Sequence, residues 1–166
     1  METSSKMTTM FKPLFAGKKI FLEANDGKKF ICNSAETFSS YIDPDFEKFG
    51  LNKSGLATLE ILLEIHELIL STMFKQIFPT LNSDLDKLVM TQSQIIRFCE
   101  KYPAYLCRDG NEICFLIKED DKYFVVSVGV DSDGLNVYTR YLKNDDRCLG
   151  SYNHRFVVPQ LIPLTK

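Results

Sequence analysis

Between Glu112 and Val158 apolar residues alternate with polar ones, and this two-residue period constrains the fold more than any other feature. The alternation divides into four stretches joined by short polar links that are typical of turns. The stretches are Glu112–Lys118, Lys122–Val130, Leu135–Leu142 and Ser151–Val158. Because consecutive strands with short links pair antiparallel, we predict a four-stranded antiparallel meander at the C-terminus.

The middle of the chain, from Ser54 to Phe78, is predicted to form one long central helix. On a helical projection Glu60, Glu64 and Glu67 fall in one narrow stripe, and apolar side chains cover the rest of the circumference. A helix that is apolar over so much of its surface packs on two or more sides or contributes to an oligomer contact. Pro79 is expected to end it.

Two short motifs predict further local structure. An Asp26-Gly27 turn lies between the β-prone stretches Lys18–Glu23 and Lys28–Cys32, a pattern that favours an N-terminal β-hairpin. Thr91 and Gln94 have the spacing of a capping box, which predicts a helix from this point to Lys101.

Length and composition favour one domain. The chain has 166 residues, of which 45% are hydrophobic and 25% charged. A chain of about 150 residues buries roughly 70% of its unfolded surface and needs no metal or disulfide to fold. We therefore predict a flexible tail over residues 1–10 and a single α+β domain over residues 11–166. This domain would consist of the N-terminal hairpin, the helical middle with its long central helix, and the C-terminal meander.

Charge and cysteine content bear on location and partners. The net charge is −2 and the five cysteines include no CxxC pair, so free thiols in a reducing compartment are expected. The N-terminus lacks the apolar core of a signal peptide, and charged residues interrupt the most apolar stretch. The sequence thus predicts a soluble cytoplasmic protein with no membrane association and no cofactor, and it lacks the basic excess of a dedicated nucleic-acid binder.

The candidate binding residues lie in the last two predicted strands. If the apolar faces of the meander are matched, Tyr138, Arg140, Asn153 and Arg155 share one polar and cationic face. Arginine offers a planar set of donors to phosphate and tyrosine offers a stacking surface. This face could bind nucleic acid or a phosphate ligand, or it could be an ordinary solvent-facing side of a sheet.

His154 is the remaining candidate site residue. Beside Arg140 and Arg155 it could act as the base of a metal-independent, nuclease-like site, although alternation places it on the core face instead. The sequence holds no nucleophile elbow, phosphate-binding loop or zinc pattern. Catalysis is therefore the less favoured of the alternatives.

The favoured hypothesis is a small non-catalytic intracellular protein that works through protein contacts. The apolar excess of the predicted long helix motivates it, because one small domain does not easily cover so much surface. The partner would be another protein or a second copy of the chain in a homodimer. Nucleic-acid or phosphate-ligand binding and the His154 enzyme stay open as alternatives.

Overall fold

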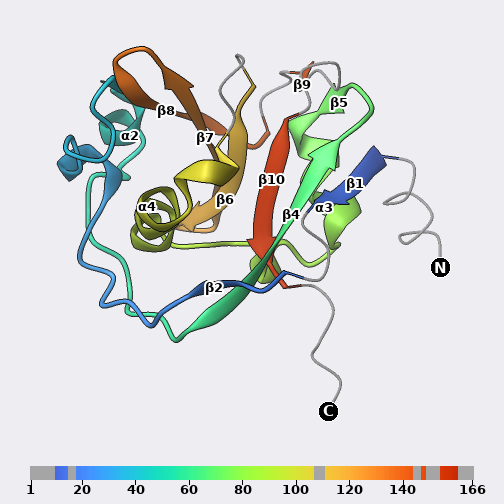
Figure 1. The fold of residues 1–166 in the computed structure, drawn as a ribbon, viewed down its shortest axis with the longest axis horizontal. Helices are drawn as coiled ribbons and strands as arrows, with labels where there is room; N and C mark the ends of the chain where they lie inside the picture. The colour runs from blue at the N-terminus through green and yellow to red at the C-terminus, as the bar shows by residue number, and fades with distance from the viewer. Residues whose placement is uncertain (1–9, 15–17, 107–110, 144–146, 149–153, 161–166) are drawn as a thin grey trace.

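A computed structural model describes residues 10–14, 18–106, 111–143, 147–148 and 154–160 (Figure 1). Within them, eight strands form one mixed sheet in the order β1-β4-β10-β6-β7-β8-β3, with β2 also paired to β4. These strands are β1 (Phe11–Leu14), β2 (Ile20–Leu22), β3 (Tyr41–Ile42), β4 (Ile61–Leu68), β6 (Ile113–Glu119), β7 (Lys122–Asp131), β8 (Gly134–Tyr141) and β10 (Arg155–Pro159). A separate two-stranded sheet pairs β5 (Thr72–Met73) with β9 (Arg147–Cys148).

Helices cover both faces of the large sheet. They are α2 (Asp45–Lys48), α3 (Phe74–Leu81) and α4 (Gln92–Lys101), with short 3-10 helices η1 (Ile31–Asn33), η2 (Leu85–Lys87) and η3 (Pro103–Tyr105). One apolar cluster joins α4 to the sheet and a second joins α3 to the opposite face. Figure 1 shows α4 lying within the curve of the sheet. The expected mixture of helix and sheet in a folded unit is confirmed, with a larger sheet than the sequence predicted.

The prediction of one long central helix from Ser54 to Phe78 is wrong, because the middle of this segment forms strand β4. Residues Ile61, Leu63 and Ile65 join the α4-side cluster, whereas Leu68 joins the α3-side cluster. A strand buried on both faces is apolar on both, so it loses the alternation that identifies a half-exposed strand. Helix α3 begins only at Phe74, after β5, and continues past Pro79 to Leu81.

The C-terminal meander is correct for three strands and wrong for the fourth. Strands β6, β7 and β8 pair antiparallel in sequence order. Strand β10 instead lies between β4 and β6, antiparallel to the first and parallel to the second. A parallel pair requires a long connection, and β6 is joined to β10 through β7, β8 and the residues that follow them.

The N-terminal hairpin is also wrong. Strand β2 pairs with β4, with Ile20 opposite Leu63. The segment expected to be its partner, Lys28–Cys32, forms no strand, and its last two residues begin η1. The turn at Gly27 is present, but the residues at this turn pair with Gly55 and Thr58 and not with the segment that follows the turn. A turn motif fixes local backbone geometry without fixing which strand lies beside it.

The helix predicted from the capping box is confirmed as α4. The Thr91 side chain accepts from the Gln94 amide, and the Gln94 side chain accepts from the Thr91 amide, at 3.1 and 2.9 Å. Just before this cap, Val89 bridges Leu116 of β6 while Leu88 packs on the α3 side. Residues 88–91 thus lead from the α3 side of the sheet to the α4 side, past the edge of β6 at Leu116. This passage places the start of α4 on its face of the sheet.

Three of the five cysteines, Cys32, Cys99 and Cys114, are free thiols. Burial raises the pKa of the Cys99 thiol far above its ordinary range. The predicted tail lies outside the described residues except for Met10. Within the described part of the chain, the helices are too short to be apolar membrane spans.

Candidate functional site

The first part of β4 and the segment before it form a two-stranded ribbon with β2. Strand pairing between Ile20 and Leu63 continues past the end of β2 through an isolated bridge between Asn25 and Thr58. The Asn25 and Thr58 amides each donate to the other residue's carbonyl, at 2.9 and 2.8 Å. The ribbon therefore extends from β2 and β4 to the turn at Gly27, far beyond the two named strands.

The far end of this ribbon is held tightly. Gly27 has a φ of 77°, and a Cβ at this position would overlap the backbone of Gly55 and Leu56. The Gly55 amide donates to the Gly27 carbonyl at 3.0 Å. Asn25 in turn accepts from the Ser93 hydroxyl of α4 at 2.7 Å. The loop that carries Leu56 is thus anchored to the turn and, through Asn25, to the helix.

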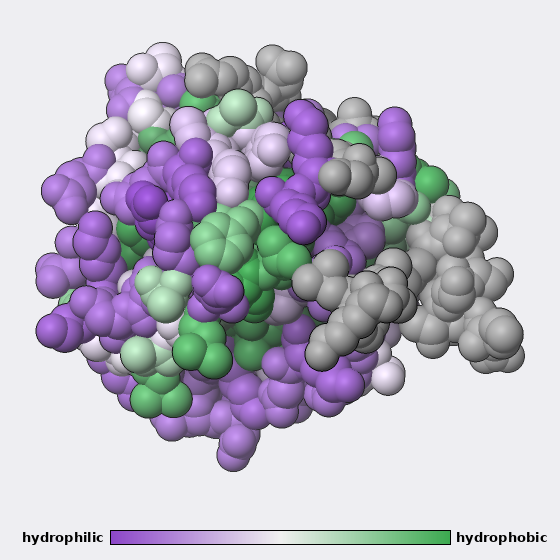
Figure 2. All heavy atoms as spheres, turned by 60° about the horizontal axis from the view of Figure 1, so that its bottom comes forward, coloured by the Kyte–Doolittle hydropathy of each residue, from purple (hydrophilic) through white to green (hydrophobic). Residues whose placement is uncertain are grey.

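This hydrogen-bonded ribbon carries four apolar side chains that are not fully buried, named here the apolar strip: Phe21, Leu56, Leu59 and Leu62. Leu56 and Leu59 are each 84% exposed. Phe21 and Leu62 are half-buried and lie opposite one another in the β2–β4 pairing. Figure 2 shows one face of the molecule, on which apolar side chains gather with polar side chains around them.

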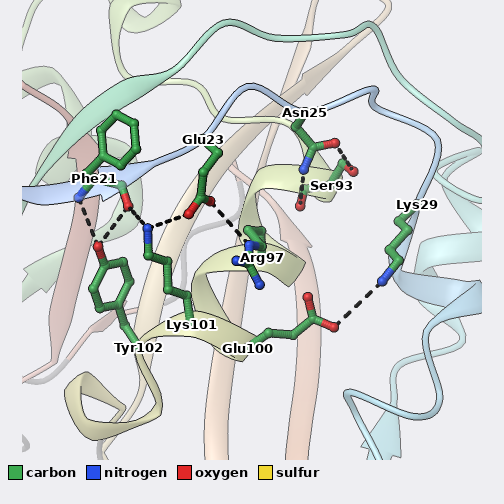
Figure 3. Close-up of polar contacts among 9 residues, drawn as sticks. All are labelled: Phe21, Glu23, Asn25, Lys29, Ser93, Arg97, Glu100, Lys101 and Tyr102. Atoms are coloured by element: carbon green, nitrogen blue, oxygen red, sulfur yellow. Dashed lines mark hydrogen bonds and ion pairs between the residues drawn. The ribbon is translucent and has the colours of Figure 1, made fainter.

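A polar network from α4 borders the strip at Phe21 (Figure 3). The Tyr102 hydroxyl accepts from the Phe21 amide at 3.0 Å and donates to the Phe21 carbonyl at 2.7 Å. The Lys101 ammonium donates to the same carbonyl at 3.0 Å and lies 5.0 Å from the centre of the Phe21 ring. These contacts cap the outer edge of β2 and hold the Phe21 backbone in place.

Glu23 connects the network to two cations of α4. Its carboxylate accepts from Lys101 at 2.6 Å and from Arg97 at 3.3 Å. The hydrogen bond from Lys101, then its own backbone amide and Arg97, lower the pKa of Glu23 to about 2. A further ion pair joins Lys29 to Glu100 at 3.7 Å. The ribbon is therefore fixed to the helix by charged contacts at several points along its length.

The strip and its border have the composition of a protein contact surface. Such surfaces place apolar and aromatic side chains at the centre and polar or charged ones around them. The described residues contain no group of three or more metal-ligating side chains, and the strip carries no nucleophile or titratable base. The apolar side chains of the strip can lose solvent-exposed area when another apolar surface covers them.

Two of the sequence-predicted site residues share a face of the sheet. Tyr138 and Arg140 both point to the α3 side of β8, where Tyr138 lies beside Tyr41 with ring centres 5.2 Å apart. The Arg140 guanidinium lies 5.2 Å from the centre of the Phe74 ring, at the start of α3. Arg140 is therefore engaged with the helix that covers this face.

Arg155 lies on the opposite side of the sheet, so the single cationic face expected from alternation is not formed. It donates to the Tyr105 carbonyl at 2.7 Å, and its β10 neighbour Val157 belongs to the α4-side cluster. Strands β6 and β7 also separate β10 from β8. Asn153 lies outside the described residues. A ligand-binding role for these residues stays a prediction.

His154 precedes β10 and is half-buried. Burial lowers its pKa, the positive charge of Arg140 lowers it further, and the carboxylate of Glu112 opposes both effects. The imidazole thus lies within electrostatic range of Arg140. Glu112 is the carboxylate among the groups that perturb it, and the nuclease-like hypothesis stays a prediction.

Sequence reasoning missed the apolar strip because it placed Leu56 and Leu59 at the beginning of a helix. One signal was present in the sequence. The Ser54-Gly55 pair precedes the leucines and is a typical turn dipeptide, which favours a loop at this point. The network around Phe21 joins residues some 80 positions apart in the sequence, at Tyr102 and Lys101, and no local pattern indicates it.

Comparison with protein-family models, with curated proteins and with solved structures gives no match for this chain.

Proposed function

We propose that this chain is a non-catalytic protein that acts through protein–protein contacts and that the apolar strip is its contact surface. The observation that carries the proposal is the 84% exposure of Leu56 and Leu59 on a loop with paired backbone. Single exposed leucines are common on protein surfaces. Leu56 and Leu59 lie on the segment that leads into β4, where half-buried Phe21 and Leu62 are paired, and burying these apolar side chains against a partner would be favourable.

The rigidity of the ribbon supports this proposal. A loop that is already ordered loses little conformational entropy on binding, so more of the contact energy appears as affinity. The bridge between Asn25 and Thr58 and the close approach of Gly27 to Leu56 supply this order. The leucines are thus presented in a fixed position, as anchor residues of protein interfaces are.

The edges of the sheet argue for contact through side chains rather than through added strands. Strand β1 exposes Lys12 and Pro13, and both residue types protect edges against further pairing. The edge of β2 is occupied by Tyr102 and Lys101. Strand β3 has only two residues. The described edges therefore offer little for strand addition, and the apolar strip is the better docking surface.

The test is site-specific photo-crosslinking in cells that naturally produce the chain. A photoreactive residue replaces Leu59, and we expect one or a few discrete crosslinked products. These products should disappear when Leu56→Asp is added, because a carboxylate would be buried against an apolar partner surface. Both positions are exposed, so folding stability should change by no more than about 0.5 kcal/mol.

The matched control places the same photoreactive residue at Leu70, which is 49% exposed on the turn after β4 and lies outside the strip. Products that form equally from positions 59 and 70, or that persist with Leu56→Asp, would show random collision and reject the proposal. The absence of any product from position 59 would also reject it.

A further inference from the structure

The charges around the apolar strip indicate what kind of partner it would bind, an inference that rests on the proposed function. Three segments carry or border the strip: residues 18–29, residues 55–62 and residues 97–101. Together they hold six basic and four acidic side chains, an excess of positive charge on a chain whose net charge is −2. The basic residues are Lys18, Lys19, Lys28, Lys29, Arg97 and Lys101, and the acidic ones are Glu23, Asp26, Glu60 and Glu100.

Ion pairs within the protein occupy Lys29, Arg97 and Lys101, and they leave Lys18, Lys19 and Lys28 with the acidic Asp26 and Glu60. Glu23 is occupied by Arg97 and Lys101. In contrast, Lys19 and Lys28 are exposed and form no ion pair among the described residues. Lys19 immediately precedes β2, and the Lys28 carbonyl accepts from Ser54 beside the leucine loop at 2.8 Å. A lysine therefore lies near each end of the strip.

A second copy of the chain is a poor occupant of this surface. In a symmetric dimer the same patch faces itself, so the excess positive charge of one strip would meet that of the other. Like charges brought together at an interface oppose association. A partner with carboxylates beside its apolar residues would instead be attracted to Lys19 and Lys28.

We propose that the strip binds a peptide segment of another protein that presents apolar anchors flanked by acidic residues. The anchors would pack against Leu56, Leu59 and the Phe21 ring. The acidic flanks would lie near Lys19 and Lys28. Because those lysines are at the solvent-exposed rim, they would act mainly on partner choice and association rate, whereas the leucines would supply most of the affinity.

The test is a selection from a random peptide library displayed on phage, using the full chain as bait. Peptides that also bind Leu56→Asp/Leu59→Asp are removed. The control bait is Ile69→Asp/Leu70→Asp, which changes two exposed apolar residues outside the strip. We expect peptides that combine apolar and acidic residues, bind the control bait unchanged and bind the strip variant at least about tenfold more weakly.

Charge reversal then separates this inference from the proposed function. Lys19→Glu/Lys28→Glu should weaken the selected peptides several-fold, and salt should weaken their binding to the original chain. Strip-dependent peptides that are neutral or basic would overturn the acidic partner while leaving the proposed function in place. A concentration-dependent dimer that is lost in Leu56→Asp/Leu59→Asp would overturn the acidic partner and show that a second copy of the chain occupies the strip. If no strip-dependent peptide is recovered and no such dimer forms, both proposals fail.

Discussion

The Tyr102 hydroxyl satisfies both backbone groups of Phe21, accepting from its amide and donating to its carbonyl. One side chain from the end of α4 thus replaces the neighbouring strand that β2 lacks on its outer side. The contact protects the edge and fixes the backbone that carries the aromatic ring of the apolar strip. Stability and surface geometry therefore depend on the same pair of residues.

Removing this hydroxyl should destabilise the protein. In Tyr102→Phe the Phe21 amide loses its partner, whereas the carbonyl keeps the Lys101 ammonium. We expect a loss of about 1–2 kcal/mol, measured as the free energy of unfolding in urea. Hydrogen exchange at the Phe21 amide should become faster. Tyr41→Phe, at an exposed edge, is the control and should cost less than about 0.5 kcal/mol. Equal losses in the two variants would contradict this account.

The sequence predicted those elements whose signals are local. The capping box of Thr91 and Gln94 defines α4 because both hydrogen bonds lie within four residues. The three strands β6, β7 and β8 follow from alternation and short links. Their neighbours along the chain are also their neighbours in the sheet, so sequence order was sufficient.

The errors arise where the partner of a segment is distant in the sequence. Strand β4 lies within the sheet between β1 and β10 and is buried on both faces. Its Glu64 and Glu67, together with Glu60 just before the strand, have helical spacing. The predicted face with Arg155 failed because β10 pairs with β4 and β6 instead of β8. The candidate site depends on the same distant pairing, since Leu56 lies on a segment that pairs with Asn25 and Gly27.

The close approach of Gly27 to Leu56 predicts a large effect of a single methyl group. Gly27→Ala should destabilise the protein by more than about 2 kcal/mol, because it combines an unfavourable positive φ with overlap of the Leu56 carbonyl. Gly50→Ala is the matched control, since Gly50 has a φ of 74° and open space around it. Its cost should be about 1 kcal/mol. Similar free energies of unfolding for the two variants would show that the ribbon is looser than described.

Glu23 predicts a specific acid dependence of stability. Its pKa in the folded protein is about 2, below its ordinary value of 4.5, so the carboxylate stabilises the folded state above pH 4.5. This contribution should be lost as the pH falls from 4.5 toward 2. The measurement is the difference in melting temperature between the original chain and Glu23→Gln across this range, which should shrink on acidification. The same series with Glu36→Gln, an exposed carboxylate without an ion pair among the described residues, should show a smaller change.

His154 offers a direct test of how its surroundings are arranged. The positive charge of Arg140 lowers its pKa and the carboxylate of Glu112 raises it. Arg140→Gln should therefore raise the pKa of His154, and Glu112→Gln should lower it. The chain has only two histidines, so NMR titration can follow the His154 imidazole signal separately. If neither variant moves the His154 titration, the imidazole lies beyond the reach of both charges. Shifts of the predicted signs would place it between Arg140 and Glu112 in solution.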